Sequence, residues 1–485
     1  MKTPFNKKRL TVGIYDYALH FVGGGQMYGV EIAAALQERY AITLISSKSV
    51  TSEKLTNWYG LDTSLCDFKV LELPSYMYVD EDRINPGIAD LHDENPFDLI
   101  SEESRNYDIF VVNQLEKIKP LSAFSVLLCH FPERPQHVKF FHSNKFSHII
   151  ANSKYTAGWI QKRWQLFEDE VIYPPVDAEF TQVSKEKIIL SVARFDQSGS
   201  KQQHRMIDAF SELNEKYRKT MAGWKLILAG SSIAGNKYLN SLSASTKRTD
   251  SLIEVKANLT RSQILKLYAR ASIFWHICGL DEFEPGLVEH FGITTVESMQ
   301  NKCVPIVVDG GGQREIVRDR EDGYLVGTLN LLERRTVDVI SNNKRYEQLS
   351  EGSYEQALSF GRNKFLNKIY RLFDFIDIKH SEFQKSDTFL DESLVCRKIP
   401  TRFIHWDMRI FGWFLTLALF KYGWPRRLIS AYITSELGIL MRILWCRRQC
   451  HLITAARFIR GFFASCMKDG LRASILKGLR WVKFS

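Results

Sequence analysis

Short apolar runs that alternate with amphipathic stretches constrain the fold of this 485-residue chain most strongly. They recur from residue 10 to about residue 370, and β-branched or aliphatic residues dominate each run. Parallel strands joined by helices give this pattern, because such strands are buried on both faces. The pattern restarts after Pro174 and Pro175, which favour an extended connection. The sequence therefore predicts an α/β protein with two doubly wound halves.

The domain boundaries follow from this restart. A first Rossmann-like domain is predicted over residues 1–175, and a second over residues 186–378. A polar linker follows, and residues 395–485 form a separate basic, amphipathic and mainly helical tail. Ligands of doubly wound sheets bind at the carboxyl ends of the strands, so the functional residues are expected just after strands.

The net charge of +10 is concentrated in the tail. Beyond residue 400, fifteen Lys and Arg residues accompany only three acidic residues, and bulky apolar side chains lie between them. This pattern is typical of helices on an anionic membrane surface. A small helical domain packed on the body or on another subunit is an alternative. RNA binding is a third, weaker alternative, and a nucleic-acid partner is not expected. No run is long enough to span a membrane; the nearest, residues 410–420, lies between Arg409 and Lys421.

Cysteine usage and the N-terminus bear on localisation. The eight cysteines are scattered without the paired spacing of a metal site, which fits a reducing cytosol. Asp16 and His20 interrupt the first apolar run, and no small-residue cleavage site follows it. A cytoplasmic protein is expected, peripheral to the inner face of the membrane if the tail binds lipid.

The segment VEHFGITTVESMQNKCVPIVVDGGGQREIV, residues 288–317, carries two glutamates, a Phe-Gly pair and three glycines. A helix is predicted to begin near Gly292 or Ile293, and free N–H groups at a helix start attract anions. Glu289 precedes this helix and Glu297 lies one turn inside it. The two carboxylates can reach hydroxyl groups on either side of a bound diphosphate. Alternatively, they are ordinary acids at a helix start and the glycines form a plain turn.

The order of these elements resembles the donor-binding signature of retaining glycosyltransferases of family 4. The stretches EHFGITTVES and VPIVVDGGGQREIV carry the match, and the resemblance covers about residues 10–375. It implies the GT-B fold, in which two Rossmann-like domains face each other. It also implies transfer of a sugar from a nucleoside diphosphate to an acceptor hydroxyl with retention at the anomeric carbon, in surface polysaccharide or glycolipid assembly. The implied partners are the nucleotide sugar and a glycan or lipid-linked acceptor.

The resemblance also assigns roles to residues. Glu289 would orient the donor sugar, and His130, after the strand in LLCHFPERP, would lie beside it. Arg194 and Lys201 would grip the diphosphate, although Gln202 replaces the glycine that commonly follows this lysine. The remaining predicted donor contacts are Gly24 and Gly25 in the first glycine-rich turn, the helix start at Gly292, Ile293 and Thr294, and Glu297 on the ribose.

Several alternatives remain open. A nucleotide-sugar or glycan-binding protein without catalysis, or an epimerase or hydrolase of nucleotide sugars, could share this donor site. Nicotinamide chemistry is disfavoured, because Tyr28 stands where a dinucleotide fold needs its third glycine. No cofactor and no metal are expected. The acids Asp281, Glu282 and Glu284 are assigned to a solvated or acceptor-facing loop.

Overall fold

The computed structural model describes residues 9–385, apart from residues 82, 179, 181, 233–234 and 247–251. The predicted tail over residues 395–485 and the basic N-terminal residues 1–8 lie outside this part of the chain. Within it, no helix is both long and apolar enough to cross a membrane. Its cysteines, Cys66, Cys129, Cys278 and Cys303, are buried and unpaired.

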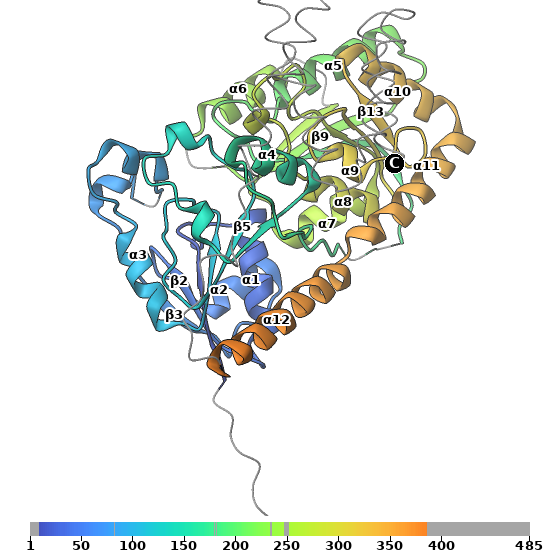
Figure 1. Cartoon of the computed structure of the whole chain (residues 1–485). Helices are drawn as coiled ribbons and strands as arrows, with labels where there is room; N and C mark the ends of the chain where they lie inside the picture. The colour runs from blue at the N-terminus through green and yellow to red at the C-terminus, as the bar shows by residue number, and fades with distance from the viewer. Residues whose placement is uncertain are drawn as a thin grey trace, which may run out of the picture. The chain divides into compact units, whose positions relative to one another are not determined.

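A seven-stranded parallel sheet forms the first half, in the order β3-β2-β1-β4-β5-β6-β7 (Figure 1). The sequence predicted five of its strands; it missed β3, which is largely exposed, and β7, which has only two residues. The strands are β1 (Thr11–Tyr15), β2 (Ala41–Ser46), β3 (Asp67–Val70), β4 (Ile109–Asn113), β5 (Phe124–Cys129), β6 (His148–Ala151) and β7 (Glu170–Val171).

The helices of the first half begin where the local sequence supplies caps. Thr51 caps α2, and Ser153 caps α4 by accepting a hydrogen bond from the Thr156 amide. The α-helices are α1 (Gly24–Leu36), α2 (Ser52–Tyr59), α3 (Asp98–Glu103) and α4 (Lys154–Trp164). The 3-10 helices are η1 (Ser75–Met77), η2 (Pro86–Leu91), η3 (Ser104–Asn106), η4 (Pro135–His137) and η5 (Ser143–Lys145).

A second parallel sheet, of six strands, forms the other half in the order β10-β9-β8-β11-β12-β13. Its strands are β8 (Glu186–Val192), β9 (Lys225–Gly230), β10 (Ile253–Ala257), β11 (Ala271–His276), β12 (Val304–Val308) and β13 (Tyr324–Val326). Its helices are α5 (Gln203–Lys216), α6 (Lys237–Thr246), α7 (Arg261–Arg270), η6 (Pro285–Leu287), α8 (Ile293–Gln300), α9 (Gln313–Ile316), α10 (Leu329–Ser341), α11 (Asn343–Ala357) and η7 (Leu358–Phe360). The predicted fold of two Rossmann-like sheets is confirmed.

The chain crosses between the halves twice, and the two crossings lie side by side. The Val176 amide donates to the Phe360 carbonyl at 3.3 Å, and Val176 forms a β-bridge with Gly361. The second crossing leads into α12 (Arg362–Lys385), which runs along the first half (Figure 1). The second domain was predicted to continue to residue 378, and a polar linker to follow. Both expectations fail at α12, which remains helical to Lys385 and packs on the first sheet.

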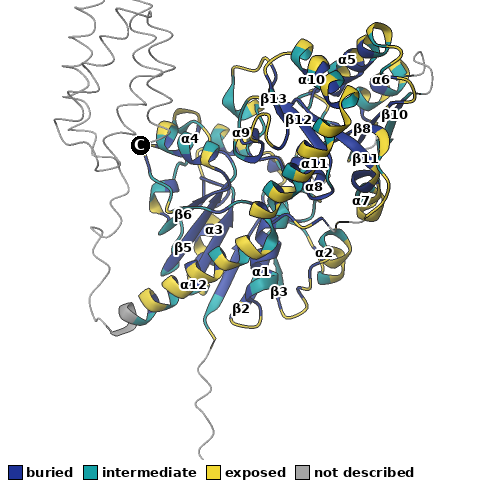
Figure 2. Cartoon of the chain, turned by 90° about the vertical axis from the view of Figure 1, so that its right-hand side faces the viewer, coloured by how far each residue is buried: buried dark blue, intermediate teal, exposed yellow. Residues whose placement is uncertain are grey.

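An apolar stripe explains why α12 leaves the second half. Phe365, Ile369, Leu372, Phe373 and Ile376 follow helical spacing and belong to the same core as β1 and α1. Figure 2 shows buried strands beneath α12 and exposed residues along its outer face. The stripe predicts a helix from the sequence, but both sheets offer an apolar face, so spacing alone does not determine where it packs.

We predict that Phe373→Ala destabilises the first half by about 3–5 kcal/mol, because it leaves a cavity in a packed core. Phe375→Ala makes the same chemical change on the same helix, but Phe375 is 45% exposed. It should have a much smaller effect. Urea unfolding followed by circular dichroism measures both. Equal shifts of the two midpoints would contradict this packing of α12.

Candidate functional site

The helix predicted in the segment over residues 288–317 begins where expected. Helix α8 starts at Ile293, and Gly292 precedes it with φ of +116°, a backbone conformation that favours glycine. A Cβ atom at Gly292 would also lie 2.5 Å from Gln313 Nε2. The backbone N–H groups of the first turn and the positive end of the helix dipole favour binding of an anion at the N-terminus of α8.

The three glycines that follow β12 support the backbone in front of α8. The Gly312 amide donates to the Glu289 carbonyl at 2.8 Å. A Cβ atom at Gly311 would overlap that carbonyl oxygen, and one at Gly312 would lie 2.5 Å from Phe291 Cα. The glycines therefore allow two backbone segments to touch. The glycine turn is therefore the support that holds Glu289 in place.

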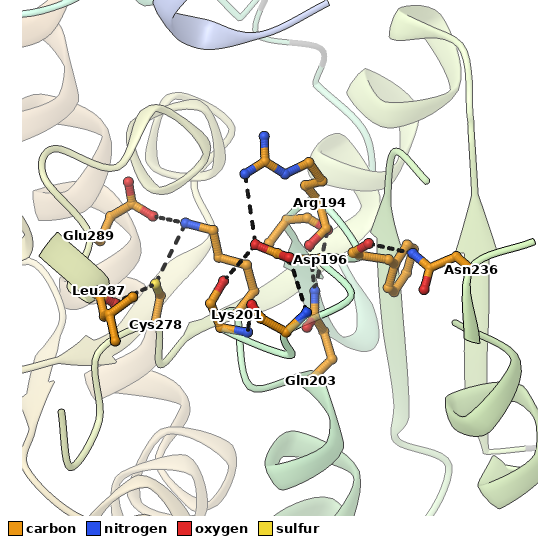
Figure 3. A network of polar contacts seen from close by, with 12 residues as sticks. Arg194, Asp196, Lys201, Gln203, Asn236, Cys278, Leu287 and Glu289 are labelled. Carbon is orange, nitrogen blue, oxygen red and sulfur yellow. Dashed lines mark hydrogen bonds and ion pairs between the residues drawn. The ribbon is translucent and has the colours of Figure 1, made fainter. Parts of the chain in front are cut away.

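Glu289 lies in a polar cluster at the carboxyl end of β11 (Figure 3). Its Oε2 accepts hydrogen bonds from Lys201 Nζ at 2.9 Å and from His276 Nε2 at 3.0 Å. Lys201 Nζ also lies 3.5 Å from Cys278 Sγ. The side chains of His276, Glu289 and Lys201 are 2%, 20% and 22% exposed, so this charged group is largely removed from water.

The charges in this cluster hold each other in place. Burial by itself raises the pKa of Glu289, but Lys201 and His276 outweigh it and hold this pKa well below its ordinary value. Burial lowers the pKa of Lys201, but the Glu289 carboxylate outweighs it, so this pKa is raised. Both groups are therefore charged at neutral pH.

Arg194, the other predicted clamp, lies on the loop between β8 and α5 and has a 69% exposed side chain. Its Nη2 is 3.9 Å from Asp196 Oδ2 (Figure 3). The positive charge of Arg194 also lies close enough to Lys201 to reduce, in part, the rise in the pKa of that lysine. Gln202 adopts φ of +56°, in the left-handed region. This conformation explains why glycine suits the position after the lysine.

Glu297, predicted to hold a ribose, lies inside α8 and is 7% exposed. Its Oε1 accepts from Arg261, and its Oε2 accepts from the Tyr268 hydroxyl at 2.9 Å. Both partners come from α7. The two glutamates of the motif therefore have different environments: Glu289 pairs with the lysine of the loop before α5, and Glu297 pairs with α7.

The first half brings its predicted residues to the same place. A Cβ atom at Gly24 would lie 2.5 Å from Ile293 Cδ1, and one at Gly25 would lie 3.4 Å from His130 Nε2. The first glycine-rich turn thus lies against the start of α8 on one side and His130 on the other. The structure brings together residues that the sequence could only assign separately.

His130 is held by two asparagines at strand ends: Asn113 ends β4 and Asn152 follows β6. Asn113 Nδ2 donates to Asp16 Oδ2 at 2.5 Å and to the Gly25 carbonyl at 3.0 Å, so its Oδ1 faces the imidazole. His130 Nε2 then donates to Asn113 Oδ1 at 2.7 Å, and Asn152 Nδ2 lies 3.5 Å from His130 Nδ1. Burial is the main cause that lowers the pKa of His130 to about 4, and His290 lowers it further. The imidazole is neutral at pH 7.

Side chains from both halves join directly near the site. The rings of Phe131 and His290 stack at 4.2 Å with an interplanar angle of 8°. Glu284, expected on a solvated or acceptor-facing loop, binds Arg134 at 2.5 Å and Arg163 at 2.6 Å in the first half. Its loop partner Asp281 pairs with Arg205 at 2.7 Å.

A second inter-half contact uses the start of α4. The amides of Lys154 and Tyr155 donate to the Glu315 carboxylate at 2.9 and 2.6 Å, and the Tyr173 hydroxyl donates to it at 2.8 Å. A carboxylate at a helix start is stabilised by the helix dipole. The glutamate of the glycine motif therefore bridges the two halves.

The sequence missed several residues that shape this site. Asn113 and His276 each end a strand, so the rule that placed His130 could also have found them. Arg261 begins α7 and Tyr268 lies in its last turns, and both residue types are common in helices. Nothing in their spacing indicates contact with Glu297.

Part of the chain is similar in sequence to known proteins. The sequence profile of the family described as glycosyl transferases group 1 matches residues 176–356. Residues 176–356 are therefore similar to this family. It is 26% identical over 285 residues to the alpha-1,3/1,6-mannosyltransferase ALG2 of Rhizomucor pusillus. That similarity covers 47% of this chain and 62% of the length of the mannosyltransferase.

Solved structures of other proteins show the same fold. Anabaena HepE in complex with UDP-glucose gives a TM-score of 0.57 at 16% identity, covering 75% of this chain and 99% of HepE. Sucrose-phosphate synthase from Thermosynechococcus elongatus gives 0.56 at 13% identity, covering 76% and 100%. WaaG, a glycosyltransferase involved in lipopolysaccharide biosynthesis, gives 0.53 at 13% identity, covering 74% and 98%. The two-sheet architecture is the GT-B fold.

Proposed function

We propose that this protein is a retaining glycosyltransferase that moves a sugar from a nucleoside diphosphate to an acceptor hydroxyl. The observation that carries the proposal is that the start of α8, which follows the Lys201–Glu289 pair, lies against the glycine-rich turn of the other half. The same turn lies against His130. The similarity of residues 176–356 to the group 1 family and the UDP-glucose complex of HepE support it.

The diphosphate is proposed to bind at the N-terminus of α8. Breaking the bond to the sugar builds negative charge on the leaving diphosphate. The amides of Ile293 and Thr294, with Lys201 and Arg194, would stabilise that charge. Gly292 and Gly24 keep side chains away from the backbone there, which lets phosphate oxygens approach closely. No metal is needed for this step, because the charge is met by the helix and the cations.

Glu289 and Glu297 are proposed to bind hydroxyl groups on either side of the diphosphate. A carboxylate accepts several hydrogen bonds, so each can keep its protein partners and still receive a sugar hydroxyl. Glu289 would orient the transferred sugar, and Glu297 the ribose. Neither acts as a nucleophile in this account. The acceptor attacks from the face of the leaving group, whose phosphate takes the acceptor proton, and this gives retention.

His130 is proposed to position the sugar as a neutral imidazole. Both of its ring nitrogens face asparagine side chains, and its lowered pKa keeps it uncharged in the physiological range. Asn113 belongs to this role, because its amide links His130 to Asp16 and to the backbone of Gly25.

The acceptor is proposed to be a glycan or a lipid-linked sugar in surface polysaccharide or glycolipid assembly. The basic stretch over residues 400–485 would bring the enzyme to an anionic membrane surface from the cytoplasm. Sedimentation of the full chain with vesicles tests this part. Binding to anionic vesicles that weakens with salt supports it, and equal behaviour with neutral vesicles contradicts it.

A transfer assay tests the reaction and separates it from the alternatives. The full chain is incubated with labelled UDP-, GDP- and ADP-hexoses, with and without lipid-linked saccharides. A transferase releases nucleoside diphosphate and labels the acceptor, with the anomeric configuration kept in the product. A hydrolase releases it without acceptor, and an epimerase changes the sugar without release. Binding of a nucleotide sugar with no turnover in any arm favours the non-catalytic binding protein.

We predict that Glu284→Gln weakens closure of the two halves around the donor. The substitution removes the charge that binds Arg134 and Arg163, while these partly exposed pairs contribute only about 1 kcal/mol. The apparent KM for the nucleotide sugar should rise about fivefold, which is the effect of that free energy on an equilibrium. Glu282→Gln changes a neighbouring exposed acid as the control. An unchanged KM for Glu284→Gln would contradict this role.

A further inference from the structure

The cluster around Glu289 also has the composition of a metal site. His276, Cys278 and Glu289 each offer one ligand atom, and these atoms lie within 4.8 Å of one another. Within the part of the chain that the structure describes, this is the group of side chains with such an arrangement. His276 is 2% exposed and Cys278 is 3% exposed, so the backbone at the end of β11 holds both firmly.

The ligand set indicates which metal would bind. Zinc prefers imidazole nitrogen, thiolate sulfur and carboxylate oxygen, at about 2.0–2.3 Å from the ion. Magnesium and calcium prefer oxygen ligands alone. Three protein ligands also leave a fourth tetrahedral position open, as in zinc sites that are not purely structural.

At present a cation of the protein itself occupies this position. Lys201 Nζ donates to Glu289 Oε2 at 2.9 Å and lies 3.5 Å from Cys278 Sγ (Figure 3). A zinc ion bound to these atoms would be too close to an ammonium, because two like charges at this distance repel strongly. Zinc and the lysine therefore exclude each other. The Lys201 side chain is 22% exposed and stands on a loop, so it has a route toward solvent.

We propose that Zn²⁺ binds His276, Cys278 and Glu289 as an inhibitor, and that its binding displaces Lys201. The Cys278 thiol gives up its proton to solvent when zinc binds, and no oxidant or reductant is involved. The inhibition rests on the proposed function: zinc would occupy the carboxylate that orients the sugar and remove the lysine from the diphosphate. Zinc would then compete with the nucleotide sugar.

Cobalt spectroscopy of the full chain tests metal binding separately from activity. Co²⁺ replaces Zn²⁺ in such sites, and a thiolate ligand gives a near-ultraviolet charge-transfer band. The wild type and Cys66→Ser, which changes a buried cysteine of the first half, should both develop the band with one equivalent and lose it to added Zn²⁺. Cys278→Ser should lose it while keeping the wild-type circular dichroism. His276→Ala serves as a second variant and should weaken cobalt binding at least tenfold.

The outcomes separate this inference from the proposed function. A band that survives in Cys278→Ser places the thiolate ligand elsewhere and overturns the site, as does the absence of any band in the wild type. A cobalt site in a protein that binds no nucleotide leaves the metal site standing and removes the inhibitory role. If both ligands bind, excess nucleoside diphosphate should raise the cobalt concentration needed for half of the signal.

Discussion

Lys201→Met is expected to lower kcat for sugar transfer by about 10²–10³, the range seen when one group that stabilises a developing negative charge is removed. Methionine keeps most of the volume of the lysine stem but has no charge. In the structure, this ammonium binds Glu289 at the end of the loop before α8, where the leaving diphosphate is proposed to lie. Lys187→Met, a change on strand β8 at an exposed lysine, should keep wild-type activity.

Loss of activity could also come from loss of stability, since Lys201→Met leaves Glu289 without its ammonium partner. Removing one member of a buried pair costs about 3–5 kcal/mol, and the remaining hydrogen bond from His276 should keep the cost at the low end. The double variant Lys201→Met/Glu289→Gln removes both charges. It should recover most of the stability in urea unfolding but none of the activity. Recovery of activity in the double variant would show that the lysine acts only through folding.

Gly312→Ala is expected to destabilise the second half by about 1–3 kcal/mol, the usual cost of forcing an extra carbon into a packed site. The added Cβ would overlap the His290 carbonyl oxygen and lie 2.5 Å from Phe291 Cα, and both are backbone atoms that cannot rotate away. The loop that carries Glu289 must therefore move. A shift of about 1 Å in a catalytic group can lower the rate about 10²-fold.

Gly327→Ala is the matched control for this substitution. It adds the same methyl group near the same sheet, where no atom lies within 4 Å of the new Cβ. It should leave the urea midpoint and kcat close to those of the wild type. Wild-type activity in Gly312→Ala would show that the glycine turn does not hold Glu289 in place.

The sequence predicted the strands better than the packing of the helices. Strands such as β4 and β12 are continuous apolar runs, because both faces of a parallel sheet are covered, and such runs are easy to recognise. Helix α12 was assigned to the wrong half. Its stripe of apolar residues fits any apolar surface, and the crossing at Val176 and Gly361 that returns the chain to the first sheet leaves no pattern of its own.

The sequence predicts the position of a site residue where that residue directly follows a strand or begins a helix. The helix start at Gly292 and the place of His130 after β5 follow from that rule. The different partners of the two glutamates do not follow from that rule. Glu289 meets Lys201 and His276, and Glu297 meets Arg261 and Tyr268, through contacts between segments far apart in sequence. The role of the glycine cluster as a backbone support required the three-dimensional contact with Glu289.

Binding of the donor nucleotide tests the proposed donor site directly. The melting temperature of the full chain is measured with UDP, GDP, ADP and their sugars, for the wild type, Glu297→Ala and Arg194→Ala. One nucleotide should raise the melting temperature of the wild type, because a ligand stabilises the state that binds it. Both substitutions should remove this effect. The same shift in all three proteins, or none in the wild type at millimolar nucleotide, would contradict a donor site at the start of α8.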